Sequence, residues 1–122
     1  MKLLDTNILI YSGDPAYSGF LTSLVTDPSN VVSAISKVET LGFHRITPAQ
    51  TVYFESLFKI LRVLPVDDAV IQKATELRRL QKMTLGDALI AATALVNNAT
   101  LVTRNTADFL GVPGLVVENP LP

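Results

Sequence analysis

The feature that most constrains this chain is its opening stretch, MKLLDTNILI, in which a polar triplet separates two apolar runs. Leu3 and Leu4 precede the triplet, and residues 8–10 follow it. This pattern predicts a buried strand that ends at Asp5 and turns directly into a helix. Open α/β sheets build their functional sites at the carboxyl ends of strands. Asp5 is therefore the first candidate for a functional residue.

Size and composition limit the class of protein. The 122 residues suffice for one domain with a hydrophobic core, so we expect a single domain over residues 1–122. No cysteine is present, which excludes disulfides and thiolate metal sites. No apolar stretch reaches the roughly 18 residues that span a bilayer, so we expect no membrane association and a cytoplasmic protein.

The charge of the chain gives no general argument for nucleic-acid binding, because the net charge is only −1. Lys82, Arg78 and Arg79 form the only dense basic cluster. A solvated helix face is the simpler explanation of that cluster.

Short apolar runs alternate with segments of helical periodicity along the chain. After the opening strand we expect strands at residues 31–34, 61–66, 101–103 and 115–117. We expect helices at residues 7–11, 17–26, 35–43, 47–60, 67–81 and 87–96. The strands are apolar throughout rather than alternating, which is typical of a parallel sheet that is covered on both faces. The sequence thus predicts a three-layer α/β fold whose central, mostly parallel sheet has five strands, the fifth short.

Four acids stand out by position. Asp5 ends the first strand, Glu39 lies in the helix after the second, Asp87 begins an apolar helix, and Asp108 follows the fourth strand. The carboxyl ends of parallel strands meet at one edge, so Asp5 and Asp108 belong there. Glu39 can reach that edge if its helix starts there. Asp87 cannot be placed from the pattern alone, because the path of the chain before it is undetermined.

A divalent cation would explain such a cluster of carboxylates. Neighbouring ionised carboxylates repel each other, and one should stay protonated unless a cation lies between them. With oxygen donors only, and His44 the single histidine, the expected ion is Mg²⁺ or Mn²⁺. Such a metal activates water for phosphodiester hydrolysis. Polar neighbours could orient the carboxylates and waters: Thr6, Asn7, Thr103 and Asn105.

Each acid also has a simpler interpretation. Asp5 could only cap the following helix, and Asp108 could be an ordinary turn residue. Glu39 could be a surface residue, and Asp87 could be only the capping-box partner of Thr84.

Other polar and aromatic residues have simple interpretations too. We expect His44 to be a surface histidine. We expect Tyr53, Phe54 and Phe58 to be core or interface residues rather than a platform for stacked bases.

Four motifs together resemble the PIN-domain family, and in particular its VapC-like toxins: LLDTNILI, SAISKVETLGF, LGDALIAATAL and LVTRNTADFLGVPGLVVENP. The resemblance implies a metal-dependent endoribonuclease in which Asp5, Glu39, Asp87 and Asp108 surround Mg²⁺. We expect Asp5, Asp87 and Asp108 to bind the metal and Glu39 to hold a metal-bound water or a second ion. The resemblance also implies that Asp87 reaches the carboxyl edge, and that Thr103 and Asn105 support the last acid.

The resemblance further implies partners. These are an RNA substrate, such as tRNA or rRNA, a cognate antitoxin whose tail occupies the active-site groove, and a second copy in a homodimer. Apolar residues in the stretches 11–24 and 51–61 are candidates for the protein surfaces.

Two alternatives remain beside the ribonuclease. The first is a PIN scaffold that binds RNA or a protein without cutting, suggested by the acidic pI of about 5.7. The second is a receiver-like signalling domain, which also gathers acids on a parallel sheet. That class needs a lysine after the last strand, where this chain has Glu118-Asn119-Pro120.

Overall fold

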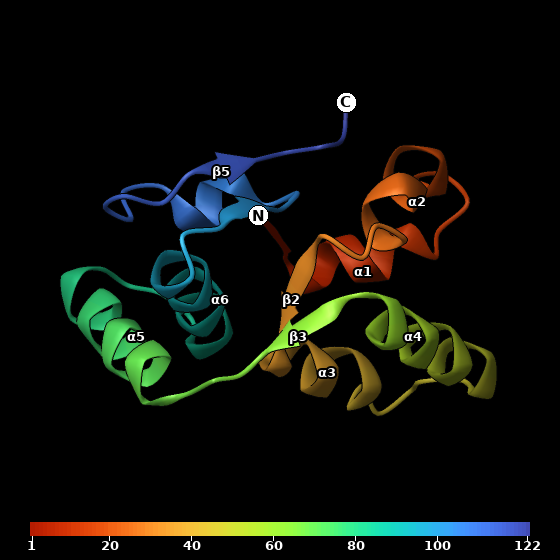
Figure 1. Cartoon of the computed structure of the whole chain (residues 1–122), viewed down its shortest axis with the longest axis horizontal. Helices are drawn as coiled ribbons and strands as arrows, with labels where there is room; N and C mark the ends of the chain where they lie inside the picture. Colours follow the sequence, from red (N-terminus) through yellow and green to blue (C-terminus); the bar gives the residue numbers. More distant parts are fainter.

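The computed structural model describes residues 1–122, and a central five-stranded sheet organises it (Figure 1). The strands are β1 (Lys2–Leu4), β2 (Val31–Ser33), β3 (Arg62–Leu64), β4 (Thr100–Val102) and β5 (Val117–Glu118). Their order is β3-β2-β1-β4-β5, and every neighbouring pair is parallel. The predicted parallel α/β sheet is confirmed, and β1 lies at its centre.

Six α-helices and one 3-10 helix connect the strands. They are α1 (Thr6–Ser12), α2 (Ser18–Val25), α3 (Ala34–Leu41), α4 (Pro48–Ile60), α5 (Asp68–Leu80), α6 (Leu85–Val96) and the 3-10 helix η1 (Thr106–Phe109). The segment after β4, predicted as a polar turn, therefore contains a short helix.

β2 and β4 lie within one residue of the predicted bounds, and two strands differ by two residues at one end. The strand predicted at 61–66 is only Arg62–Leu64, because Pro65 has no N–H to donate to the sheet. The strand predicted at 115–117 is Val117–Glu118, since the N–H of Leu115 closes a turn onto Val112 O instead.

Successive strand residues enter two separate cores, which accounts for the apolar strands. Leu3, Val31 and Leu101 join the core beneath α5 and α6. Leu4 and Val102, one residue further along, join the core on the other face beneath α1, α2 and α4. The sheet is therefore buried on both sides, as the continuous apolar runs predicted.

Local capping fixes where the helices begin. Thr47 and Gln50 form a reciprocal capping box at the start of α4, with Pro48 at its first position. Asp67 accepts the N–H of Val70 at the start of α5, and Thr84 accepts the N–H of Asp87 in α6. These caps satisfy N–H groups that the helices leave free.

The path of the chain before Asp87, which the sequence left open, follows from α6 and β4. Thr100 pairs with Lys2 at the amino ends of β4 and β1, and α6 ends close before it at Val96. A helix of 12 residues is about 18 Å long, so the start of α6 lies at the opposite, carboxyl edge. Residues 81–84 join α5 to α6, and these two helices lie side by side (Figure 1). The chain therefore returns to the carboxyl edge along α5.

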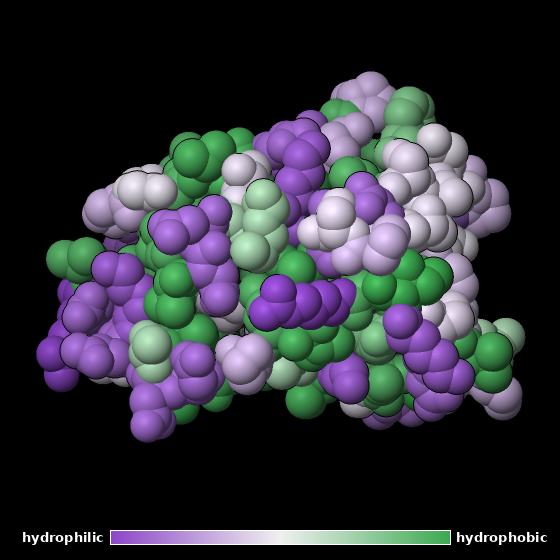
Figure 2. Space-filling view, viewed as in Figure 1, coloured by the Kyte–Doolittle hydropathy of each residue, from purple (hydrophilic) through white to green (hydrophobic).

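The surface mixes apolar and polar side chains. No helix combines the length and apolar character that crossing a bilayer requires. On the face shown in Figure 2, hydrophobic patches alternate with hydrophilic side chains. Large apolar side chains such as Ile10, Phe43, Ile71 and Leu85 are at least half exposed, so apolar surface remains for partners.

Candidate active site

Asp5 occupies the centre of the carboxyl edge. It follows β1 directly, its N–H donates to Val102 O at 2.9 Å, and its side chain is only 7% exposed. Its Oδ1 accepts the N–H of Thr6 at 2.7 Å, which makes it the N-cap of α1. Asp5 therefore caps α1 through Oδ1, and its second carboxylate oxygen, Oδ2, takes no part in the cap.

A polar network from β4 and α1 holds that second oxygen. Thr103 Oγ1 donates to Asp5 Oδ2 at 2.8 Å, and Asn7 Nδ2 donates to Thr103 Oγ1 at 3.2 Å. The backbone N–H of Asn105 also donates to Thr103 Oγ1, at 3.1 Å. Thr103 thus contacts the carboxylate directly, whereas Asn7 and Asn105 act through Thr103, and the exposed Asn105 side chain bonds to no acid.

Glu39 projects from α3 toward the start of α1 and α6. Thr6 Oγ1 lies 2.7 Å from Glu39 Oε1 and 2.8 Å from Ser36 Oγ. On α6, a Cβ built on Gly86 would lie 3.0 Å from Glu39 Oε2. Three elements therefore fix the direction of this carboxylate.

The apolar residues of α3 describe its inner face only in part. Ile35 packs against the core beneath α5 and α6, but the buried residues of α3 are Ser36 and Thr40, and Phe43, just after the helix, is 51% exposed. Small hydroxyl side chains suit this face because α3 packs against α1, α4 and α6. Glu39 is exposed at the edge of that contact and reaches the site from there.

Asp87 and Asp108 meet beside the loop between α5 and α6. Asp87 lies in the first turn of α6, and Asp108 lies in η1. Both line a shallow pocket of about 570 Å³ together with Lys82 and Thr84. Asp87 is half-buried and Asp108 is exposed.

The pKa values show that the four acids influence one another. Burial raises the pKa of Asp5 to about 6, the hydrogen bonds from Thr103 and Thr6 oppose the rise, and the charges of Asp87 and Glu39 add to it. Burial also raises the pKa of Asp87; its contact with Thr84 opposes the rise, and Asp108 and Glu39 add to it. The acids from β1, α3, α6 and η1 thus share one electrostatic environment.

The donor set suits a hard divalent cation. All candidate ligands are carboxylate oxygens, and Asp5 carries a charge that burial and its acidic neighbours disfavour. No three His, Asp or Glu side chains are close enough here to form a metal-binding group. Asp108 is exposed and is free to turn toward Asp5 when a cation binds, whereas Glu39 is held by Thr6.

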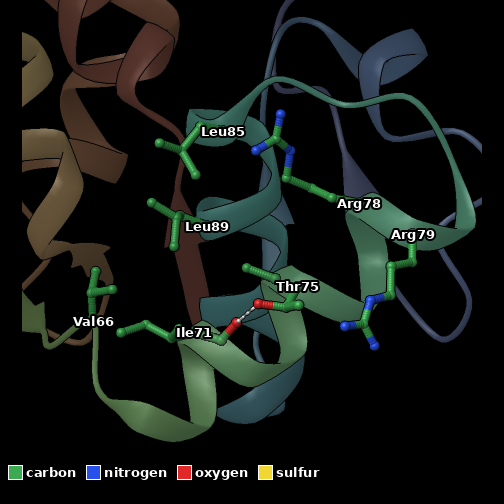
Figure 3. A pocket seen from close by; sticks show the side chains of 8 residues that line it. Val66, Ile71, Thr75, Arg78, Arg79, Leu85 and Leu89 are labelled. Carbon is green, nitrogen blue, oxygen red and sulfur yellow. Dashed lines mark hydrogen bonds between the residues drawn. The ribbon is translucent and has the colours of Figure 1, made fainter.

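The basic cluster divides between two surfaces. Lys82 faces Asp87 and Asp108, as described above. Arg78 and Arg79 line an apolar groove of about 520 Å³ between α5 and α6 (Figure 3). The Nε–H of Arg78 also donates to Met83 O at 3.3 Å. Leu85 and Leu89 of α6 line the same groove, which contains none of the four acids.

The remaining polar and aromatic residues lie where the simpler interpretations place them. His44 is exposed in the turn after α3. Phe54 is buried, and Tyr53 and Phe58 pack against the core beneath α4. Tyr53 also contacts Ser12 through their hydroxyls, at 2.7 Å. These aromatic side chains therefore belong to the core and present no stacked platform.

The sequence reasoning missed three residues at this edge. Ser36 contacts Thr6, Gly86 lies against Glu39, and Arg104 lies over the rings of Tyr11 and Tyr17. The sequence gave a partial signal for these three residues, since each of them lies within three residues of a predicted site residue.

Comparison with known proteins agrees with this geometry. The PIN-domain sequence profile matches residues 2–115. Ribonuclease VapC10 from Mycobacterium tuberculosis is 31% identical over 116 aligned residues, which cover 89% of this chain and 86% of that protein. A toxin–antitoxin complex from Klebsiella pneumoniae contains a chain with a TM-score of 0.78 and 32% identity, covering 98% of both chains. VapBC2 from Rickettsia felis, solved with a DNA fragment from its promoter, gives a TM-score of 0.79 at 26% identity, covering 97% of both chains. The chain therefore belongs to the PIN-domain family, among its VapC-like toxin ribonucleases.

Proposed function

We propose that this protein is a Mg²⁺- or Mn²⁺-dependent endoribonuclease that hydrolyses phosphodiester bonds in cytoplasmic RNA such as tRNA or rRNA. The proposal is supported by the position of four acids from four separate elements near the carboxyl edge of the sheet, where acidic neighbours add to the effect of burial in raising the pKa values of Asp5 and Asp87. The family of the chain and the ribonuclease name of its Mycobacterium tuberculosis relative support the same activity.

The chain's own residues take distinct parts in this mechanism. Asp5, Asp87 and Asp108 would hold the cation, with Asp5 oriented by Thr103. Glu39, oriented by Thr6, would accept a proton from the attacking water. A bound Mg²⁺ or Mn²⁺ would supply Lewis-acid activation and stabilise the charge that develops on the phosphate oxygens.

The test is cleavage of RNA with each divalent ion by matched pairs of variants. We expect Asp87→Asn and Glu39→Gln to lower cleavage by at least about 100-fold. Asp68→Asn, in the first turn of α5, and Glu55→Gln, on the exposed face of α4, are the controls and should cut like wild type. Equal cutting by Asp87→Asn and the wild type would mean that the activity comes from a contaminant.

We further propose a protein antitoxin whose tail occupies the groove beside Glu39. That groove, of about 210 Å³, is lined by Ile10, Phe43 and Phe54 together with Glu39 and Gln50. An apolar segment lying there would cover Glu39 and block access to the acids. The toxin–antitoxin complex from Klebsiella pneumoniae supports this type of partner.

A homodimer is also part of the proposal. Among the stretches predicted as partner surfaces, Phe20 is 51% and Val52 68% exposed. The groove of Figure 3 adds exposed Ile71 and Leu85, away from the acids. A second copy covering apolar side chains of this kind would leave the acidic edge open. Light scattering at micromolar concentration should give the mass of two chains, and the mass of one chain would contradict the proposal.

The non-cleaving scaffold remains the second candidate. It is favoured by the spacing of the acids, since no three of them form a metal-binding group before any side chain moves. Calorimetry separates the two candidates. A ribonuclease should bind Mn²⁺ in a way that Asp87→Ala abolishes, and a scaffold should show no such binding.

A further inference from the structure

Arg104 has the most tightly held cationic side chain near the acidic edge. It follows β4, between Thr103 and Asn105. Its guanidinium carbon lies 4.6 Å from the ring centre of Tyr11 and 5.0 Å from that of Tyr17. The two rings meet edge to face, with centres 5.1 Å apart. The backbone N–H of Arg104 donates to Asn7 Oδ1 at 3.4 Å.

This arrangement orients the guanidinium without neutralising it. The ion pairs of the protein are Lys2–Glu118 and Lys73–Glu76, so Arg104 has no carboxylate partner. Contact with aromatic rings attracts the cation, and the contacts with Tyr11 and Tyr17 engage only part of the five guanidinium N–H groups, so that others remain for an anion. The guanidinium edge is suited to paired hydrogen bonds with phosphate oxygens.

The position of Arg104 relative to the acids is set by α1. Tyr11 lies six residues after Asp5, which corresponds to about 9 Å along a helix at about 1.5 Å per residue. Arg104 therefore bounds the acidic edge on the side of α1 and α2. Lys82 bounds it on the side of α5 and α6, which cover the opposite face of the sheet.

An RNA strand needs cations at this edge because the four carboxylates repel its phosphates, and the net charge of −1 provides no general attraction. We propose that Arg104 binds the RNA phosphate that flanks the scissile bond on the α1–α2 side, and that Tyr11 and Tyr17 are its positioning residues. This inference rests on the proposed ribonuclease activity and adds to it a contact that sets where the substrate strand lies.

Arg104→Ala tests the contact through the split between KM and kcat. We expect KM for RNA to rise roughly 10-fold or more, as for loss of a charge-assisted hydrogen bond, with kcat within about twofold. The slope of log affinity against log salt should fall by about 1. Arg104→Lys should keep the salt slope and recover only part of the affinity, because lysine cannot form the paired contact. Arg79→Ala, in the groove of Figure 3, is the control and should change neither value.

Single methylphosphonate linkages, which are uncharged, locate the phosphate that Arg104 contacts. Placed one at a time on either side of the cut, one such linkage should weaken binding to wild type and have no effect on Arg104→Ala. If the alanine variant does not fold, Arg104→Gln, which keeps most of the side-chain length, takes its place. The inference is overturned if wild type cuts RNA while the variant keeps its KM and salt slope. It is also overturned if the variant loses only kcat and thermal stability, as a purely structural arginine would. Failure of wild type to cut RNA would instead overturn the proposed function.

Discussion

Thr103 donates a 2.8 Å hydrogen bond to Asp5, although the two residues lie 98 positions apart in the sequence. They meet because β1 and β4 are parallel neighbours in register, with Leu4 opposite Val102. The residue that follows each strand, Asp5 after β1 and Thr103 after β4, therefore lies at the same point of the sheet edge. The alignment of two strands, more than any local sequence signal, orients the buried carboxylate.

Thr103→Val should impair the site more than the fold. The change leaves Asp5 Oδ2 and the Asn7 side chain without their shared partner, which should cost about 1–3 kcal/mol of stability. It also removes a hydrogen bond that lowers the pKa of Asp5, so the acid limb of the cleavage profile should move to higher pH. Thr100→Val, in the same strand, is the control for measurements of unfolding and of the pH–rate profile. An unchanged acid limb would contradict the role given to Thr103.

Asp5 should make the metal-free protein less stable as the pH rises. Its folded pKa of about 6 exceeds the ordinary 3.8, so the folded state binds this proton more tightly than the unfolded state does. The contribution of this group to stability is therefore complete below pH 4 and is lost as the pH passes 6. Asp5→Asn should be more stable than wild type above pH 7, by at most about 3 kcal/mol, because asparagine also caps helices.

Unfolding by urea in EDTA across a pH series measures this effect. The curves for wild type and Asp5→Asn should converge at pH 4 and below. Asp27→Asn provides a control of opposite sign, because hydrogen bonds from Ser29 lower the pKa of Asp27. That variant should be less stable than wild type above pH 4, and the difference should disappear as the pH falls through the lowered pKa of Asp27. A constant difference between Asp5→Asn and wild type at every pH would contradict the raised pKa.

Gly86→Ala should separate activity from stability. The added Cβ would lie 3.0 Å from Glu39 Oε2, so the carboxylate must move. Alanine favours a helix over glycine by up to about 1 kcal/mol, so the thermal midpoint should hold or rise while cleavage falls. Gly19→Ala in α2 is the matched control, because nothing lies within 4 Å of its Cβ position. Full activity in Gly86→Ala would show that the direction of Glu39 is unimportant.

Phe43→Ser should weaken inhibition by the proposed antitoxin without affecting cleavage by the free protein. Phe43 is 51% exposed and lines the groove beside Glu39, so its loss removes apolar contact area for a bound segment. Val52→Ser is the control, since Val52 is 68% exposed but lies outside that groove. Inhibition titrations with the cognate antitoxin provide the measurement. Equal effects of the two substitutions would place the inhibitor elsewhere.

Much of the fold could be predicted because the signals were local. Apolar runs such as residues 3–4 and 101–102 identified buried strands, and the helix predicted at 47–60 is α4 to within a residue. The end of β3 was predicted too late because the run continued past Pro65, which cannot donate to the sheet.

The site was harder to predict because it depends on contacts between distant segments. Periodicity oriented α3 by its apolar residues, yet its inner face is Ser36 and Thr40, which allow close approach of neighbouring helices. Asp87 could not be placed until the return made by α5 was visible. Arg104 lies between the predicted residues Thr103 and Asn105, but its own role could not be predicted, because only the folded sheet brings it against Tyr11 of α1.

The strands of this sheet have at most three residues each, which leaves little tolerance for insertion. One extra residue in β1 or β4 would exchange the side chains that enter the two cores, because neighbours along a strand point to opposite faces. It would also shift Asp5 by one residue along the strand, so that Asp5 would no longer lie beside Thr103. Changes in chain length at the centre of the sheet should therefore abolish folding and chemistry together, whereas the connection between α3 and α4, with its exposed residues 42–45, should accept them.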